Sequence, residues 1–144
     1  MIVKIKRIHP HAVVPSKGTP QSAAFDLYIP YYDDAIFIRP GVISSISLGF
    51  ATEIPAGYYA SVHIRSSLGK KGVVLSNSTG IIDSDYRGEW KIMLTSIGSG
   101  EQIVMPGERV AQVIFRKVEH FEFEECNDLS DTSRGVGGFG STGS

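Results

Sequence analysis

The feature that most constrains the fold is a succession of short runs of alternating apolar and polar residues, each closed by proline or glycine. In the clearest run, Tyr58, Ala60, Val62 and Ile64 fall on one side of an extended chain and their neighbours fall on the other. Comparable strand-like runs cover residues 1–7, 23–29, 36–38, 42–50, 73–75, 90–95, 110–115 and 121–124. Many short strands with such turns are typical of a β-sandwich or barrel, so the sequence predicts an all-β fold.

Two segments depart from the strand pattern. Residues 9–21 hold three prolines, which prevent a helix and favour a loop or extended arm. Residues 65–72 read as a strand that runs into a single helical turn, with a serine as its N-cap and Gly72 as its terminator. The free N–H groups of this turn, beside Arg65 and Ser66, would suit a phosphate, although a plain capped turn explains the pattern as well.

Length and charge limit the possible partners. A chain of 144 residues is most simply one domain. Its formal net charge of −1 and its lack of like-charge runs disfavour nucleic acid as a partner, so we expect a small molecule. Cys126 is the only cysteine, which excludes an internal disulfide and fits a reducing compartment. With no apolar signal core and no run of membrane-spanning length, we expect a cytoplasmic, intracellular protein without a membrane partner.

Two polar residues interrupt apolar strands. Asp26 stands inside an apolar run, so its carboxylate either lies at a strand end in solvent or meets hydrogen-bond donors or a hydrated cation. Gln112 stands inside the run 110–115, and its amide must be paired if it is buried. It is therefore a candidate positioning group, with a solvated strand-end glutamine as the alternative.

The segment 80–89 carries the densest chemistry. Ile81 and Ile82 are strand formers, and the acidic stretch that follows is turn chemistry, so we predict a hairpin whose second strand is 90–95. Because residues i and i+2 share a face in an extended chain, one of Asp83 and Asp85 would point into a cavity while the other caps the turn. The alternative is that both are solvated turn acids.

The last eleven residues are glycine-rich. Such composition is by default disordered, yet a plain linker needs no arginine, phenylalanine or Ser-Thr pair. Arg134 matches a phosphate, Phe139 offers a face to a planar base, and glycines let N–H groups approach an anion. We therefore predict a domain over residues 1–133 and a flexible arm over 134–144 that closes over a site as a lid.

Five stretches, taken together and in order, closely resemble the motifs of the trimeric dUTPases, the deoxyuridine triphosphate nucleotidohydrolases. They are Ala24–Leu27, Arg65–Gly69, Asn77 with Gly80–Glu89, Gly107–Gln112 and Arg134–Gly143. The resemblance spans nearly the whole chain. It implies a jelly-roll-like β fold, a homotrimer whose active sites draw on several subunits, and Mg²⁺-dependent hydrolysis of dUTP to dUMP and pyrophosphate by a dUTP diphosphatase.

The resemblance also implies roles for residues. Asp83 would orient and deprotonate the water that attacks the α-phosphorus, which agrees with an ionised carboxylate acting as a base. Asn77 would read the uracil edge, and Tyr86 would pack under the deoxyribose where a 2′-hydroxyl would clash. Mg²⁺ would be held mainly by the triphosphate and water, with Asp26 bound to it through a water molecule. The remaining substrate-binding residues would be Arg65, Ser66, Ser67, Gly69, Gly80, Ile82 and Gln112, with Arg134, Phe139, Gly140, Ser141 and Thr142 from the arm.

Two rival functions differ in their requirements. A dCTP deaminase, or a bifunctional enzyme of the same fold, needs an acid–base group beside the base ring, and the corresponding position here is Met93, which cannot carry a proton. A non-catalytic binding or regulatory protein would not need Asp83, Tyr86, Arg134 and Phe139 together. A regulatory protein partner of the enzyme stays open.

Overall fold

The computed structural model of the protein describes residues 1–31 and 34–138, and strands dominate this range. Its only helix within the described residues has four residues, so the predicted all-β fold with one short helical turn is confirmed. The elements in chain order are β1 (Lys4–Arg7), β2 (Phe25–Tyr28), β3 (Ile36–Ile38), β4 (Ser44–Ser47), β5 (Phe50–Glu53), β6 (Tyr58–Ile64), α1 (Ser66–Gly69), β7 (Val73–Leu75), β8 (Gly80–Ile82), β9 (Lys91–Ser96), β10 (Gln102–Val104) and β11 (Arg109–Lys117).

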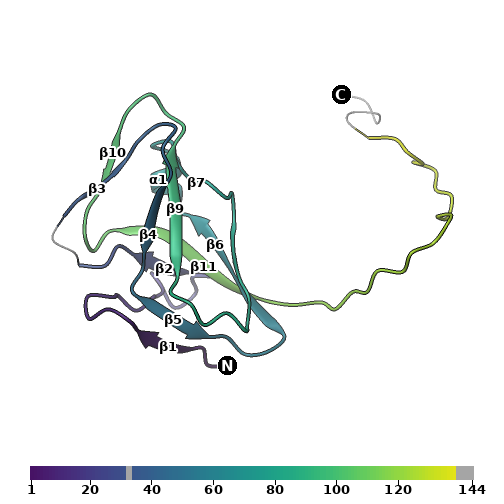
Figure 1. Ribbon diagram of the computed structural model, residues 1–144, viewed down its shortest axis with the longest axis horizontal. Coiled ribbons are helices and arrows are strands. Elements are labelled where there is room, and N and C mark those ends of the chain that lie inside the picture. The colour runs from purple at the N-terminus through teal and green to yellow at the C-terminus, as the bar shows by residue number, and fades with distance from the viewer. Residues whose placement is uncertain (32–33, 139–144) are drawn as a thin grey trace.

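Two larger sheets and two ribbons build the molecule (Figure 1). One sheet has the order β2-β11-β6-β8 and the other has the order β4-β9-β7, while β1 pairs with β5 and β10 pairs with β3. Every pairing between these strands is antiparallel. Most paired strands are far apart in the sequence. The long strand β11 lies between β2 and β6 in its sheet.

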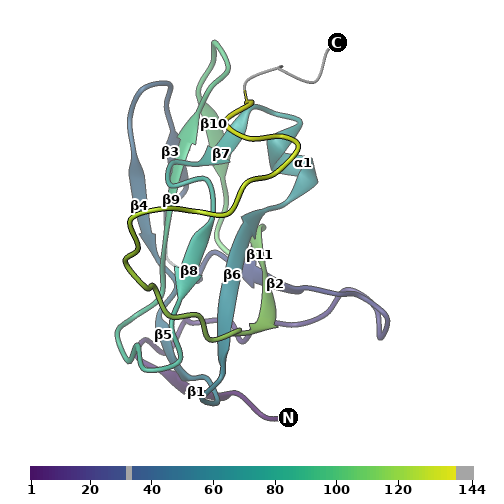
Figure 2. The ribbon, with the colours of Figure 1, turned by 90° about the vertical axis from the view of Figure 1, so that its right-hand side faces the viewer.

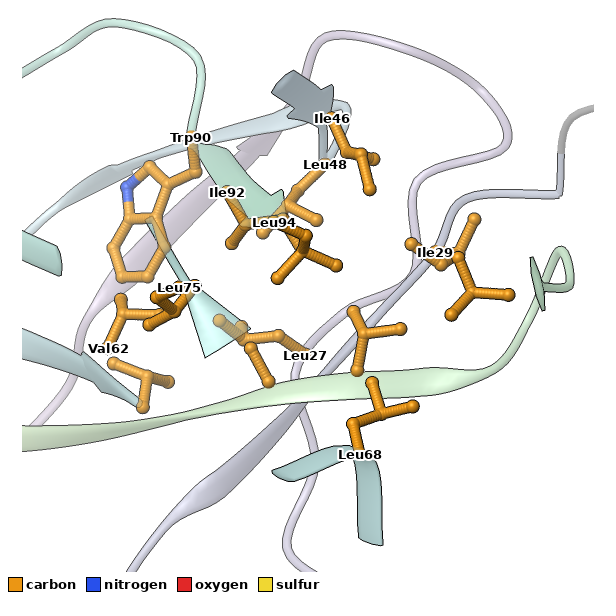
Figure 3. Packing of buried hydrophobic residues seen from close by; sticks show 14 of the residues in the cluster. Leu27, Ile29, Ile46, Leu48, Val62, Leu68, Leu75, Trp90, Ile92 and Leu94 are labelled. Atoms are coloured by element: carbon orange, nitrogen blue, oxygen red, sulfur yellow. The ribbon is translucent and has the colours of Figure 1, made fainter. Parts of the chain in front are cut away.

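The hydrophobic core lies between the two larger sheets (Figure 3). Leu27, Ala60 and Val113 come from one sheet and Leu75 and Leu94 come from the other, and all five side chains are buried. Burying a leucine contributes roughly 1.5–3 kcal/mol each, so this contact is a main source of stability.

The described residues hold one tryptophan in this core. Trp90 is 2% exposed, and its indole N–H donates to Thr52 Oγ1 at 3.1 Å, which satisfies the one polar atom of its side chain.

Several sequence expectations are confirmed. Strands occupy 36–38, 58–64 and 73–75 with the expected bounds, and those expected at 1–7, 23–29, 90–95 and 110–115 are present with ends that differ by up to three residues. Residues 9–21 hold no helix. The alternation in β6 buries Ala60 and Val62 against the core, although Ser61 on the other face is buried as well. Two short strands, β5 and β10, have ranges that the sequence pattern did not separate as strands.

The expectation of one strand over 42–50 is wrong. Gly49 has a φ of 75°, a left-handed conformation that ends β4 and lets the chain enter β5 in a different pairing. A side chain at Gly49 would also come within 3.0 Å of the Ala12 Cβ and 3.1 Å of the His9 Cβ. Glycine is therefore required there for both conformation and space.

The hairpin predicted around Asp83 is also wrong. β8 pairs with β6, Ile82 lying opposite Ala60, whereas β9 pairs with β4 and β7 in the other sheet. The segment 83–90 therefore connects the two sheets and does not join neighbouring strands. Local turn chemistry predicted the change of direction but not the strand partner, which depends on which apolar faces meet in the core.

No strand forms over residues 121–124, so that expectation is wrong as well. Phe121 and Phe123 are fully exposed, on a chain that leaves the body after β11 and runs up to residue 138 without helix or strand (Figures 1 and 2). A strand needs a neighbour for its N–H and C=O groups, and the described part of this single chain supplies none there. Within the described residues, no helix is long and apolar enough to cross a membrane.

Candidate active site

Asp26 on β2 is clamped between two arginines. The residue is 8% exposed, its Oδ1 forms an ion pair with Arg65 Nε at 2.9 Å, and its Oδ2 accepts a hydrogen bond from Arg109 Nη1 at 3.2 Å. Of the alternatives that the sequence left open for this acid, the structure selects a buried carboxylate that meets donors. The pair of cations compensates its charge, as burial of a carboxylate requires.

A register shift in β11 brings Arg109 to this carboxylate. Gln112 lies opposite Asp26 and Ala111 opposite Leu27, but the next partner, Tyr28, is paired with Arg109. Val110 is thus an extra residue, a β-bulge, and Arg109 falls on the same face as Gln112 and Asp26. Without the bulge, alternation would place Arg109 on the core face with Ala111. The Val110 carbonyl also accepts the backbone N–H of Arg65 at 3.4 Å.

Gln112 is half-buried beside this clamp. Its Nε2 donates to the Ile64 carbonyl at 3.3 Å, and its strand partner on β6 is His63. The expected positioning role is therefore geometrically possible, because the amide is held at a defined place. Asp26, His63, Arg65, Arg109 and Gln112 line a hollow of about 460 Å³ that Arg116 also borders. This hollow carries more basic than acidic groups and suits an anion.

The short helix α1 follows directly. The expectation of a serine N-cap is wrong: the N-cap is Arg65, whose backbone is extended and whose side chain makes no capping bond. The turn does end at Gly72 as expected, with a φ of 80°. Ser66 and Ser67 are exposed, and Ser67 lines a second hollow of about 280 Å³ with Arg65, Arg109 and Gly107. Gly69, also exposed, lies in the same helix.

A third hollow, of about 250 Å³, lies at the end of β8. Asn77, Gly80, Ile82, Asp83 and Tyr86 all border it, so the third motif residues named from the sequence are brought together. Asp83 is exposed and faces this hollow, whereas Asp85 is exposed and does not border it. The structure therefore distinguishes the two acids, as expected for one acid that faces a cavity.

The two groups of candidate residues do not meet within one chain. The hollow at Asp83 shares no lining residue with the two hollows at Arg65. In the sheet order β2-β11-β6-β8, β8 lies at one edge and β2, which carries Asp26, lies at the other, a separation of about 14 Å for strands spaced about 4.8 Å apart. A single chain thus presents two half-sites.

The C-terminal segment is described only in part. Arg134 is exposed and its Nε donates to the Gly137 carbonyl at 2.9 Å, closing a local turn. Phe139, Gly140, Ser141 and Thr142 lie outside the described residues. Arg134, the one substrate-binding candidate of the arm within the described residues, lines none of the three hollows.

Comparison with known proteins identifies the family. A family model described as dUTPase matches residues 10–143. The chain belongs to the dUTPase family. Its curated relatives include a deoxyuridine 5′-triphosphate nucleotidohydrolase of Anaplasma marginale (strain St. Maries), 44% identical over 90% of this chain and 88% of that relative. A second, of Helicobacter pylori (strain Shi470), is 40% identical over 99% of this chain and 97% of that relative. The expected enzyme class, dUTP diphosphatase, is confirmed.

Solved dUTPase structures share the fold. A mutant dUTPase of Staphylococcus bacteriophage 80alpha with dUpNHpp superposes with a TM-score of 0.83 at 22% identity, covering 99% of both chains. A mutant dUTPase from phage phi11 of S. aureus, described with a structural Mg(II) ion, has a TM-score of 0.76 at 17% identity, covering 90% of this chain and 99% of that one. The jelly-roll-like fold that the dUTPase resemblance implied is confirmed.

Two residues that border these hollows were not among the candidates named from the sequence. Arg109 was quoted within its motif but given no role, although it borders both hollows at Arg65. Glu89 was likewise quoted within its motif without a role, yet its carboxylate accepts from the Gly49 N–H at 3.1 Å and the Ser47 hydroxyl at 3.3 Å. The charge of Arg109, opposite to that of Asp26, was a signal, but reading it required the register of β2 against β11.

Proposed function

We propose that this dUTPase hydrolyses dUTP to dUMP and pyrophosphate by attack of water on the α-phosphorus, with Asp83 as the general base. The observation that carries the proposal is the placement of Asp83 in one hollow with Asn77 and Tyr86. An exposed carboxylate can accept a proton from water, while the amide of Asn77 offers a donor and an acceptor to a uracil edge. Tyr86 packs under the deoxyribose.

The phosphates bind at the other half-site. Arg65 is held by Asp26, and the Gln112 amide by the Ile64 carbonyl, so both donors are positioned before substrate arrives. Ser66, Ser67 and Gly69 add hydroxyl and backbone donors at the helical turn. Catalysis then consists of positioning and charge stabilisation, with no covalent intermediate.

The active enzyme is a homotrimer, and neighbouring copies complete each site. Two observations support this. The half-sites at Asp83 and Arg65 do not share a hollow within one chain. Phe121 and Phe123 alternate with glutamates on an exposed extended segment, as expected of a strand that pairs with another copy. The arm residues Arg134, Phe139, Gly140, Ser141 and Thr142 close the site as a lid.

Mg²⁺ fits this site only as a hydrated ion. Among the described residues there is no group of three or more histidine, cysteine or acidic side chains that could hold a metal. Both Asp26 oxygens already contact arginines, but each keeps a lone pair for a metal-bound water. Bound with the triphosphate, the ion would neutralise phosphate charge, and Asp26 would orient one of its waters.

The test of the base is Asp83→Asn, with Asp85→Asn as its matched control. Pyrophosphate release from dUTP should be lost in the first variant and kept in the second, while both bind a non-hydrolysable dUTP analogue as the wild type does. Wild-type kcat in Asp83→Asn would refute the assignment. A parallel incubation with dCTP should release no ammonia, and chelation of Mg²⁺ should lower the rate.

Complementation tests the shared site. Asp83→Asn and Arg65→Ala should each be inactive, because each destroys one half-site. If every site takes its halves from different copies of a trimer, co-refolding the two variants in equal amounts should restore about a quarter of wild-type activity. No recovery in mixed trimers would show that both halves act within one chain.

A further inference from the structure

The ring of Tyr86 folds back over Gly88. A Cβ built on Gly88 would lie 2.3 Å from Tyr86 Oη, 2.5 Å from Cζ and 2.9 Å from Cε2, distances that real Cβ contacts essentially never show. The Tyr86 hydroxyl donates to the Glu89 carbonyl at 3.1 Å, which fixes the far end of the ring. The ring therefore occupies the space that any side chain at position 88 would need.

Gly88 is there for space and not for backbone conformation. The glycines with left-handed φ values in the described residues do not include Gly88, so its backbone is one that alanine can adopt. The atoms that such a Cβ would meet belong to the far end of the Tyr86 side chain, and because this residue is 44% exposed the ring can rotate outward. Alanine at this position should thus leave the fold intact and displace only the ring.

The carbonyl that receives the hydroxyl is itself held in place. The Glu89 carboxylate accepts from the Gly49 N–H and the Ser47 hydroxyl, at the bend between β4 and β5. The next residue, Trp90, donates its N–H to the Phe50 carbonyl at 2.9 Å and is buried in the core. These hydrogen bonds connect the Tyr86 ring to strands β4 and β5, although Tyr86 itself lies on the segment that connects the two sheets.

We propose that Gly88 is a specificity-determining positioning residue, which sets the Tyr86 ring so that the site accepts a deoxyribose and rejects a ribose. The proposal rests on the proposed function, in which Tyr86 packs under the sugar. A ring that is held over Gly88 presents a fixed surface to the sugar, and a ring pushed outward leaves room for a 2′-hydroxyl. Gly88 acts through Tyr86 and does not touch the substrate.

The experiment is a double-mutant cycle of Gly88→Ala and Tyr86→Ala, with Gly100→Ala as the matched control. Gly100 also has an ordinary φ, and a Cβ there would meet nothing within 4 Å. The measured quantity is the ratio of kcat/KM for dUTP to that for UTP. Gly88→Ala should lower this ratio by about tenfold or more, the scale of a lost steric contact, and Gly100→Ala should leave it unchanged. In the Tyr86→Ala background, Gly88→Ala should change the ratio less than about twofold.

Two outcomes overturn the proposal: a wild-type ratio in Gly88→Ala, or an equal loss in the Tyr86→Ala background, which would show that Gly88 acts without the ring. Ring position is read separately from the ¹³C-tyrosine NMR signal that disappears in Tyr86→Phe, and Gly88→Ala should shift this signal while Gly100→Ala does not. An unshifted signal refutes the displacement whatever the activity. If the wild-type protein releases no pyrophosphate from dUTP, the proposed function fails and the NMR result still decides how Gly88 holds the ring.

Discussion

The clamp around Asp26 makes a quantitative prediction for Asp26→Asn. This change keeps the size of the side chain and one acceptor oxygen but removes the charge that two guanidinium groups share. The Arg65 contact, at 2.9 Å with side chains 26% and 11% exposed, is an ion pair in a largely buried place. The Arg109 bond, at 3.2 Å, is weaker because the Arg109 side chain is 48% exposed and screened by water.

The expected loss follows from these two contacts. The largely buried ion pair with Arg65 is on the scale of a polar contact to a charged group, about 1.5–3 kcal/mol, and a pair as exposed as that with Arg109 adds at most about 1 kcal/mol. Asp26→Asn should therefore lower the free energy of unfolding by about 1.5–4 kcal/mol. The assay is urea denaturation at neutral pH with protein concentration held constant, since assembly would otherwise change the apparent stability.

The matched control is Glu101→Gln, which removes the acidic partner of the exposed Arg39–Glu101 pair. That pair has side chains 62% and 37% exposed, so its loss should cost less than about 1 kcal/mol. Equal losses in Asp26→Asn and Glu101→Gln would refute the reasoning, because they would mean that burial adds nothing to the clamp. Since Arg65 would lose its partner, Asp26→Asn should also raise KM for dUTP.

Three further predictions concern other parts of the chain. Thr52→Val leaves the buried Trp90 indole N–H without its acceptor and should lower the free energy of unfolding in urea by about 1–3 kcal/mol. In a Trp90→Phe background, which has no indole N–H, Thr52→Val should no longer carry this cost. Donation from Lys4 lowers the pKa of Glu53 below its ordinary value, so this pair contributes stability above the unfolded pKa and loses it as pH falls through the folded pKa; in NMR titrations Lys4→Gln should raise that pKa, and an unchanged value would contradict the pairing. A chain that ends before Arg134 should lose about a hundredfold or more in kcat/KM if the arm supplies charge to the transition state, and an unchanged value would make the arm a spectator.

The sequence predicted best what depends on local periodicity. The bounds of β6 followed from strict alternation, and Gly72 ended its turn as expected because a left-handed residue there needs no Cβ. What failed depends on partners. Turn chemistry at Asp83 was read as a hairpin because nothing local says that Ile82 lies opposite Ala60. The alternation at Phe121 is as regular as that of a strand, but a strand requires a neighbour.

The candidate site divides in the same way. Membership of the motifs could be read from the sequence, and Asn77, Asp83 and Tyr86 meet in one hollow because they are close along the chain. The environment of Asp26 could not be read, since its two partners come from β11 and from the end of β6, and their direction depends on register. Likewise, the sequence could not predict that a side chain at position 88 would meet the Tyr86 ring, because this depends on the direction in which the ring folds back.

The extra residue in β11 has a consequence for engineering and for comparing relatives. One residue inserted between Leu27 and Tyr28 would pair with Val110, restore regular pairing and place Arg109 on the face of the hydrophobic interior. The half-site would then lose one of its cations and bury a charge at the same time. A one-residue insertion after Leu27 in a homologue therefore signals a different anion pocket, even where every motif letter is kept, whereas a gap at Val110 leaves Arg109 on the face of Asp26.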